Sequence, residues 1–302
     1  MSILVVGSIA LDTVETPFGK VEDSPGGSAL YFSAAASFFA PVNVVGVVGK
    51  DFDFEQIEFL RHRNVDLDGL MIEDGLTFRW GGRYKSDMNR RVTLFTYLNV
   101  FEKFSPQIPE HYRDSTYIFL ANIDPELQLK VLQTVHNPRL TVLDTMNFWI
   151  SGKRDALEEV IKRVDVLIVN DEEIRELTGS VRLYSAAAEL LTRGPRALVI
   201  KKGEHGAILV TKEGYFFSPA YPVENVMDPT GAGDTFAGGF LGYLAAKNSI
   251  SNGHLKNAVI YGSTVASFVV EDFSFSRLKN ITVDDVHRRA NMLRAMMAVD
   301  VE

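Results

Sequence analysis

Asp228-Pro229-Thr230-Gly231-Ala232-Gly233-Asp234-Thr235-Phe236-Ala237-Gly238-Gly239 is a glycine-rich turn that runs directly into the small and apolar residues of a helix. The unpaired N–H groups at such a helix start, together with the helix dipole, bind an anion without any lysine. Gly231 and Gly233 let the backbone approach that anion closely. Asp234 places a carboxylate beside the anion, which is unfavourable unless the carboxylate accepts a proton from a hydroxyl that attacks a phosphate. The stretch therefore predicts a phosphate-transfer site.

Two common phosphate-binding motifs do not fit this stretch. It lacks the Gly-Lys-Ser/Thr end of a P-loop, and Phe236 occupies the third glycine position of a dinucleotide fingerprint. The alternative is an ordinary glycine-rich loop whose acidic residue favours the helix dipole. The continuation through Gly238 and Gly239 favours the phosphate site over that alternative.

The same stretch resembles, almost letter for letter, the C-terminal signature of the ribokinase (PfkB-type) carbohydrate kinase family. The resemblance covers nearly the whole chain. It implies that Asp234 is the catalytic base and that the backbone of Gly231, Ala232 and Gly233 forms the anion hole for the transferred phosphate. It also implies ATP and Mg²⁺ as cofactors, and it leaves dependence on a monovalent cation open.

Composition excludes several classes of function. The 302 residues are 46% hydrophobic and 23% charged, as in globular proteins, and the net charge of −8 argues against general binding to nucleic acid or anionic membranes. The absence of cysteine excludes disulfides, thiol catalysis and cysteine metal ligands. No signal-like or membrane-spanning run is present, so we expect a cytoplasmic protein.

Short apolar runs alternate with helical patterns along the chain, which predicts a doubly wound α/β fold with a mainly parallel sheet flanked by helices. We expect residues 1–302 to form a single kinase domain. The expected strands are 3–6, 42–48, 117–120, 141–143, 166–169, 198–201 and 207–210. The expected helices are 28–39, 54–63, 126–135, 155–163, 185–191, 235–247, 255–268 and 283–297.

One hairpin interrupts this pattern. Residues 77–85 and 91–99 alternate strictly, with Phe78, Trp80 and Tyr84 on one face, and they flank a polar loop. With a further strand over 13–18, the hairpin is either an edge of the main sheet or a β lid over the substrate. The family resemblance implies a lid formed by about 13–19 and 74–100, which would exclude water from the reaction. Its aromatic face could stack a base or form a homodimer. Arg79 and Arg83, on the opposite face, could bind an anionic substrate.

Five positions are expected to contact the substrate. Asp12 follows the first strand, where doubly wound sheets place ligand contacts, although it could also be a turn residue. Gly26 and Gly27 open the next helix. Tyr31 stands where relatives often have a sugar-binding asparagine, which argues against free ribose. Asn147, with Asp144 before it, follows another strand and matches the position of the phosphate and sugar path.

Nucleotide and metal contacts are expected at the ends of later strands. Asn170 and Glu173 match the family's Asn-x-x-Glu element, which acts on Mg²⁺ largely through water, and they also fit a helix capping box. The residues expected to bind the nucleotide are Asn170, Lys201, Gly203, Thr230, Gly231, Gly233 and Gly262. Residues 221–226, together with Ser263, are expected to line the adenine slot.

These features predict an ATP-dependent kinase that phosphorylates a hydroxyl of a small sugar, polyol or sugar derivative. Its partners would be that small molecule and ATP, with neither nucleic acid nor a membrane. A nucleoside kinase of the adenosine type is the first alternative. A sugar-sensing regulator without catalytic activity is the second, and the retained Asp234 argues against it.

Overall fold

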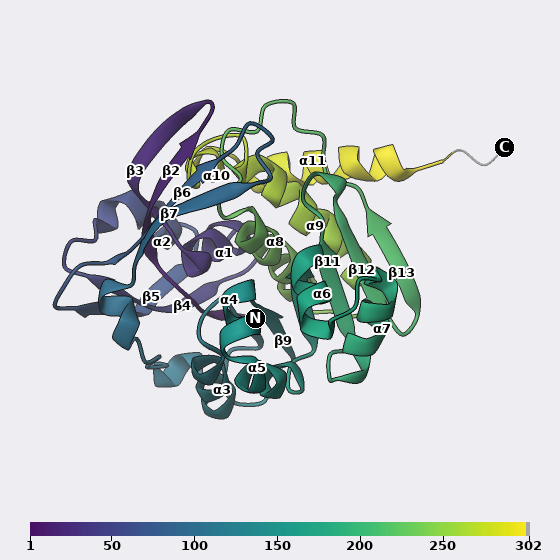
Figure 1. The fold of residues 1–302 in the computed structure, drawn as a ribbon, viewed down its shortest axis with the longest axis horizontal. Helices are drawn as coiled ribbons and strands as arrows, with labels where there is room; N and C mark the ends of the chain where they lie inside the picture. The colour runs from purple at the N-terminus through teal and green to yellow at the C-terminus, as the bar shows by residue number, and fades with distance from the viewer. Residues whose placement is uncertain (300–302) are drawn as a thin grey trace.

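The computed structural model describes residues 1–299, and a nine-stranded sheet runs through its centre (Figure 1). The order of its strands is β13-β12-β11-β10-β9-β8-β1-β4-β5, parallel from β11 to β5 and antiparallel at β12 and β13. The strands are β1 (Ile3–Val6), β4 (Val42–Gly49), β5 (Val65–Glu73), β8 (Tyr117–Leu120), β9 (Leu140–Asp144), β10 (Val166–Asn170), β11 (Ala197–Lys201), β12 (Ala207–Thr211) and β13 (Gly214–Ser218).

Helices cover both faces of this sheet, which explains its continuously apolar strands. In β1, Ile3 and Val5 join one core, while Leu4 and Val6 join the other. The first core is closed by α1 (Ser28–Ala36), α8 (Ala232–Lys247), α9 (Asn252–Val269), α10 (Ser276–Lys279) and α11 (Val283–Met297). The second is closed by α3 (Pro125–Thr134), α4 (Asn147–Gly152), α5 (Arg154–Ile161), α6 (Asp171–Thr178) and α7 (Leu183–Thr192).

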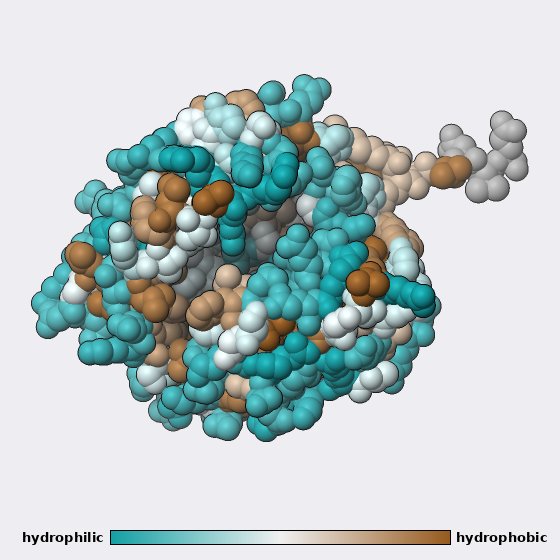
Figure 2. All heavy atoms as spheres, viewed as in Figure 1, coloured by the Kyte–Doolittle hydropathy of each residue, from teal (hydrophilic) through white to brown (hydrophobic). Residues whose placement is uncertain are grey.

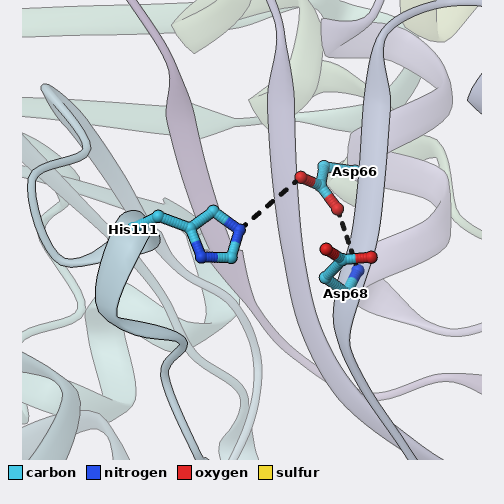
Figure 3. A group of neighbouring side chains, drawn as sticks. All are labelled: Asp66, Asp68 and His111. Carbon is cyan, nitrogen blue, oxygen red and sulfur yellow. Dashed lines mark hydrogen bonds and ion pairs between the residues drawn. The ribbon is translucent and has the colours of Figure 1, made fainter.

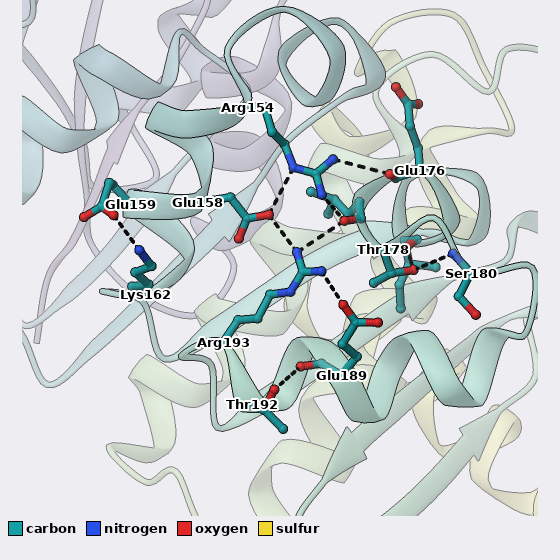
Figure 4. Close-up of polar contacts among 12 residues, drawn as sticks. Arg154, Glu158, Glu159, Lys162, Glu176, Thr178, Ser180, Glu189, Thr192 and Arg193 are labelled. Carbon is teal, nitrogen blue, oxygen red and sulfur yellow. Dashed lines mark hydrogen bonds and ion pairs between the residues drawn. The ribbon is translucent and has the colours of Figure 1, made fainter.

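An ion-pair network ties α5, α6 and α7 together (Figure 4). Glu158 Oε1 accepts from Arg154 Nε at 3.0 Å and from Arg193 Nη1 at 2.6 Å. Both arginines also donate to the backbone carbonyl of Leu177, at the end of α6. Cations are favourable at a helix C-terminus. The network therefore fixes α6, whose other end reaches the site described below.

A second sheet of four strands, ordered β3-β2-β6-β7, lies to one side of the first (Figure 1). It consists of β2 (Ala10–Thr16), β3 (Gly19–Gly26), β6 (Phe78–Tyr84) and β7 (Arg91–Tyr97). The two strands of the expected hairpin thus belong to a sheet separate from the main one. Strand β3 was missed, because only part of its polar sequence is buried.

A bulge breaks the strict alternation that we expected in this hairpin. Gly81 pairs with Phe95 while Gly82 pairs with Thr93, so Leu94 is an extra residue in β7. Because of this extra residue, the side chains of residues 91–93 point to the faces of the sheet opposite to those that strict alternation predicts. Arg91, opposite Tyr84, therefore shares a face with Trp80, and Phe95 lies on the face of Arg79.

The predicted helix over 54–63 is instead a 3₁₀ turn, η1 (Phe54–Ile57), followed by the short helix α2 (Glu58–Arg61). Strand β5 escaped prediction because it is an edge strand with charged side chains, a common protection against edge pairing. Figure 3 shows its Asp66 and Asp68 beside His111; Asp66 accepts from Asp68 N at 2.9 Å and lies 3.8 Å from His111 Nε2. Within residues 1–299, none of the helices has the length and apolar character needed to cross a membrane.

Candidate active site

The glycine-rich turn is held in place from both sides. Thr230 N donates to Asp228 Oδ1 at 2.8 Å, and Asp228 is almost fully buried. Gly231 is the N-cap of α8 with φ of +74°, and a Cβ there would overlap the ring of Tyr31. Only glycine satisfies both the left-handed backbone and the close approach. Asp234 lies in the first turn of α8, where its carboxylate is next to the exposed helix N-terminus.

Charged side chains from three strand ends converge on this turn. Asp144 ends β9 and Lys201 ends β11, while Glu173 lies in the first turn of α6, directly after β10. Lys201 Nζ is 3.1 Å from Asp144 Oδ1, and a Cβ on Gly233 would be 3.0 Å from the same Nζ. The ammonium group therefore lies against the start of α8. Carboxyl ends of parallel strands meet at one sheet edge, where α/β proteins bind ligands.

Burial dominates the acid–base properties of this cluster. It raises the pKa of Asp234 to about 7, Asp144 raises it further, and Lys201 and Arg91 oppose the shift. Glu173 is likewise raised to a pKa of about 7, mainly by burial. Burial alone would lower the pKa of Lys201, but Asp144, Glu173 and Asp234 outweigh it and raise that pKa. A protonated lysine thus faces carboxyl groups that titrate near neutral pH.

The Asn170–Glu173 element forms the capping box considered above. Asn170 Oδ1 accepts from Glu172 N at 2.9 Å and from Glu173 N at 2.8 Å, while Glu173 Oε2 accepts from Asn170 N at 2.7 Å. The box starts α6 with reciprocal hydrogen bonds. It also points the Glu173 carboxyl group towards Lys201 and Asp144, as their effects on its pKa indicate.

Asp12 and the Gly26-Gly27 pair lie together on the other side of the turn. The Asp12 carboxylate is so close to Gly26 that a Cβ there would overlap it. Burial raises the pKa of Asp12 to about 8, Asp228 and Asp234 add to the shift, and a hydrogen bond from the Gly27 backbone opposes it.

Two positions expected to contact substrate lie elsewhere. Tyr31 is only 1% exposed, because its ring packs beneath Gly231 and edge-on against Phe275 at 5.7 Å between centroids. It supports the turn and offers no surface to a substrate. Asn147 is exposed at the start of α4, where Nδ2 donates to Glu176 Oε2 at 2.5 Å. Its side chain is therefore engaged by α6.

The aromatic face of the four-stranded sheet is covered from within the chain. Tyr84 is 7% exposed and its hydroxyl is 3.2 Å from Thr230 Oγ1, while Phe78 stacks on Phe101 with 5.3 Å between centroids. The expectation that a substrate or a second subunit must cover Phe78 and Tyr84 is therefore wrong. Trp80 is partly buried on this face.

The arginines of the opposite face already have partners. Arg79 pairs with Asp23 at 3.0 Å and with Asp51 at 2.8 Å, and Arg83 Nε is 2.5 Å from Glu15 Oε2. Their face is turned away from the glycine-rich turn that Tyr84 contacts. The suggestion that Arg79 and Arg83 bind an anionic substrate is not supported.

A cavity of about 630 Å³ opens beside the turn, and Figure 2 shows the surface hollowed near the middle of this face. Its walls include Lys201, Gly203, Gly233 and Ser263. The 86–89 loop closes one side, where Asn89 Nδ2 donates to Glu204 Oε1 at 3.2 Å. The 220–226 segment, apart from Asn225, lines another wall.

Gly262 was expected at this cavity, but it serves helix packing. A Cβ on Gly262 would lie 2.8 Å from the carbonyl oxygen of Phe236, so the glycine lets α9 approach α8. Its neighbour Ser263 lines the cavity instead.

Arg91 and Asp228 were missed from the sequence. Asp228 precedes the proline of the signature and accepts from the backbone of Thr230 and Ser274, so its role is to fix the turn. Arg91 was not expected at the site, because the bulge at Leu94 that turns it to the face of Trp80 leaves no mark in the hydrophobic pattern. Its position beside the polar hairpin loop was the only available signal.

Comparison with known proteins identifies the family. The model of the pfkB family carbohydrate kinases matches residues 2–279. The chain belongs to this family. The family membership confirms the predicted α/β fold class and the reaction class, ATP-dependent phosphate transfer.

Similar proteins include both nucleoside and sugar kinases. A cytidine kinase from Thermococcus kodakarensis is 34% identical over 247 residues, covering 80% of this chain and 87% of the relative. The nucleoside kinase of Methanocaldococcus jannaschii shares the fold, with a TM-score of 0.76 at 23% identity over 96% of this chain and 98% of that one. A putative ribokinase II from E. coli, solved with ATP and Mg²⁺, has a TM-score of 0.78 at 18% identity, covering 96% and 99%.

Proposed function

We propose that this family member is an ATP- and Mg²⁺-dependent kinase whose acceptor is a nucleoside, with cytidine as the first candidate. The observation that carries the kinase assignment is the half-buried Asp234 in the first turn of α8, close to Lys201 at the glycine-rich turn. The 34% identity to a cytidine kinase over most of both chains favours a nucleoside among the acceptors expected from the sequence.

The proposed reaction assigns a role to each part of the turn. Asp234 accepts the proton of the acceptor hydroxyl, whose oxygen attacks the γ-phosphorus while the bond to ADP breaks. The backbone N–H groups from Gly231 to Gly233 stabilise the negative charge of the transferred group. Lys201 adds a positive charge from the side of β11. Thr230 holds the turn against Tyr84.

The acidic residues at the strand ends fit a hydrated magnesium ion. Glu173 uses Oε2 for the capping box, which leaves Oε1 for a water ligand. Asn170 lies at the same helix start, where its Oδ1 accepts the capping hydrogen bonds and its Nδ2 is left for a phosphate or a water. Mg²⁺ would neutralise charge on the ATP phosphates. A requirement for a monovalent cation stays a prediction, to be checked by comparing rates in K⁺ and Na⁺.

The cavity beside the turn fits the nucleotide, with Gly203 and the 220–226 segment around it. We propose that the four-stranded sheet is the lid of a single kinase domain and that Asp12, supported by Gly26 and Gly27, binds hydroxyl groups of the acceptor. Because Asp12 is protonated near neutral pH in the unliganded protein, it can donate or accept a hydrogen bond.

An acceptor panel tests the proposal. ADP formation would be measured with cytidine, adenosine, ribose, fructose, inositol and 2-keto-3-deoxygluconate. We expect a nucleoside to give the highest kcat/KM and Asp234→Asn to lower kcat by roughly two to four powers of ten without weakening ATP binding. Asp284→Asn, an exposed acid in the first turn of α11 and outside the cavity, is the matched control.

Other outcomes of this panel would correct the proposal. Ribose as the preferred acceptor would restore a simple sugar kinase. No turnover on any acceptor, together with ligand binding, would favour the regulator. Near-normal turnover in Asp234→Asn would remove that residue from the mechanism.

We also propose that β7 forms a homodimer contact. It is an outer strand of the four-stranded sheet, and Val92, Leu94 and Tyr97 are 50%, 39% and 57% exposed. An apolar edge strand of this kind needs a partner. Light scattering should give a dimer that Val92→Lys with Tyr97→Lys converts to monomer, and a monomeric parent protein would contradict the contact.

A further inference from the structure

Arg91 begins β7, the outer strand of the four-stranded sheet. Pairing of β6 with β7 sets Arg91 opposite Tyr84, and the extra residue Leu94 places it on the same face as Trp80. The guanidinium Cζ accordingly lies over the Trp80 ring, 5.1 Å from its centroid. Such cation–π stacking orients a guanidinium without consuming its hydrogen-bond donors.

This face of the sheet is turned towards the reaction site. Asp12 is the neighbour of Trp80 in the pairing of β2 with β6. Tyr84 reaches Thr230 through its hydroxyl at 3.2 Å. Arg91 therefore shares a face of the sheet with Trp80 and with Tyr84, which contacts the turn that leads into Asp234.

Arg91 also lacks a carboxylate partner, unlike the other arginines of this sheet. Arg83 and Arg90 lie 2.5 and 2.6 Å from the carboxylates of Glu15 and Asp87. Among residues 1–299, no carboxylate lies within 4 Å of the Arg91 guanidinium, which is exposed. Apart from a hydrogen bond with the Tyr84 side chain, its donors are available to an anionic ligand.

The charges around the site explain why a further guanidinium group is needed there. Asp12, Asp144, Glu173 and Asp234 surround the turn, and Lys201 is the cation among them. Arg91 lowers the pKa of Asp12, Glu173 and Asp234, against the dominant effect of burial. Its positive charge therefore acts both on Asp12, proposed to bind the acceptor, and on Glu173 and Asp234 beside the phosphate site. An ATP phosphate entering a cluster of carboxylates needs such a cation.

We propose that Arg91 is a catalytic residue whose guanidinium contacts the transferred phosphoryl group, an inference that rests on the proposed kinase function. As the acceptor oxygen attacks phosphorus and the bond to ADP breaks, the proton goes to Asp234. Arg91 keeps its own protons and donates hydrogen bonds to the equatorial phosphoryl oxygens. The four-stranded sheet thus brings a reacting group to the site in addition to excluding water.

The first experiment compares Arg91→Gln and Arg91→Lys with Arg83→Gln, the control on the opposite face of the same sheet. We expect Arg91→Gln to lower kcat by roughly two to three powers of ten, with Arg91→Lys recovering part of the loss. Because one cation near Asp234 is lost, the acid limb of the pH profile should also move to higher pH. A residue that only shapes the sheet would leave that limb in place.

A second measurement reads binding rather than turnover. The chain has two tryptophans, so Trp149→Phe leaves Trp80 as the single reporter under Arg91. Adding a non-hydrolysable ATP analogue, Mg²⁺ and cytidine should change Trp80 fluorescence in this background. The change should be largely lost when Arg91→Gln is added.

Three results would overturn the inference. Arg91→Gln could retain kcat within twofold of the parent, its pH profile could be unchanged, or Trp80 could respond equally with and without Arg91. A parent protein that transfers phosphate to no acceptor would instead overturn the proposed function, and the inference with it.

Discussion

Lys201 Nζ lies 3.1 Å from Asp144 Oδ1, with both side chains largely buried at the ends of β11 and β9, two strands that β10 separates in the main sheet. Burial would normally lower the pKa of such a lysine. Here Asp144, Glu173 and Asp234 outweigh burial, so the pKa of Lys201 is raised and its charge is fixed at neutral pH. The pair gives the phosphate site a permanent cation that the helix N-terminus alone cannot supply.

Replacing this lysine should affect binding and chemistry together. Lys201→Met leaves the carboxyl groups of Asp144, Glu173 and Asp234 without their cation, so we expect kcat/KM to fall by roughly two powers of ten or more and ATP to bind more weakly. Lys202→Met, at the next position and outside the network, is the matched control. Equal kinetics for the two variants would exclude Lys201 from the site. Steady-state kinetics and ATP titration measure both effects.

The raised pKa of Asp234 predicts a specific pH dependence. As the base, Asp234 must be deprotonated, and its pKa of about 7 in the unliganded protein places the acid limb of kcat/KM near neutral pH. Activity should therefore fall about tenfold for each pH unit below that value, while Asp234→Asn should show no such limb. A rate that is flat from pH 5 to 8 would contradict this assignment of the base.

The parts of the fold and of the site that could be predicted from the sequence are those encoded in short stretches of neighbouring residues. The glycine-rich turn, Asp234 and Lys201 follow from strand ends and a helix start, and the structure brings them together. Strand β5 could not be predicted, because an edge strand tolerates charged residues and so lacks a clear hydrophobic pattern. The bulge at Leu94 could not be predicted either, because it adds one residue to the strand without changing its composition.

Long-range contacts explain the remaining errors. Tyr31 was compared with a sugar-binding position, yet its ring fills the space that Gly231 vacates 200 residues later in the chain. Gly262 was read as a nucleotide contact, whereas the carbonyl of Phe236 on α8 requires it. Nothing in the local sequence distinguishes a glycine that faces a ligand from one that faces another helix.

Gly262 provides a direct test of that distinction. Gly262→Ala places a methyl group 2.8 Å from the Phe236 carbonyl oxygen, so we expect a loss of about 1–3 kcal/mol in the free energy of unfolding. Gly253→Ala, in the same helix, meets nothing within 4 Å and serves as the control. Urea unfolding gives the stabilities. A higher KM for ATP at unchanged stability would instead return Gly262 to the nucleotide site.

Ionisation of Asp12 should lower the free energy of unfolding at alkaline pH. Its pKa is raised from 3.8 to about 8 in the folded state, chiefly by burial, so the folded protein holds this proton more tightly than the unfolded chain. The resulting stabilisation is complete below pH 3.8 and is lost as the pH rises towards 8.

Asp12→Asn removes that titration while keeping an acceptor for the Gly27 backbone. We therefore expect the variant to be more stable than the parent at pH 8, by roughly 1–3 kcal/mol or a Tm increase of about 2–6 °C, with a smaller difference at pH 5. Calorimetry at the two pH values measures the effect, and Glu224→Gln, an exposed acid, should change neither Tm. If the variant also binds the acceptor more weakly, the result would show that Asp12 contributes to binding and at the same time destabilises the fold. A variant less stable than the parent at pH 8 would show that the Asp12 carboxylate is ionised and stabilised in the folded protein.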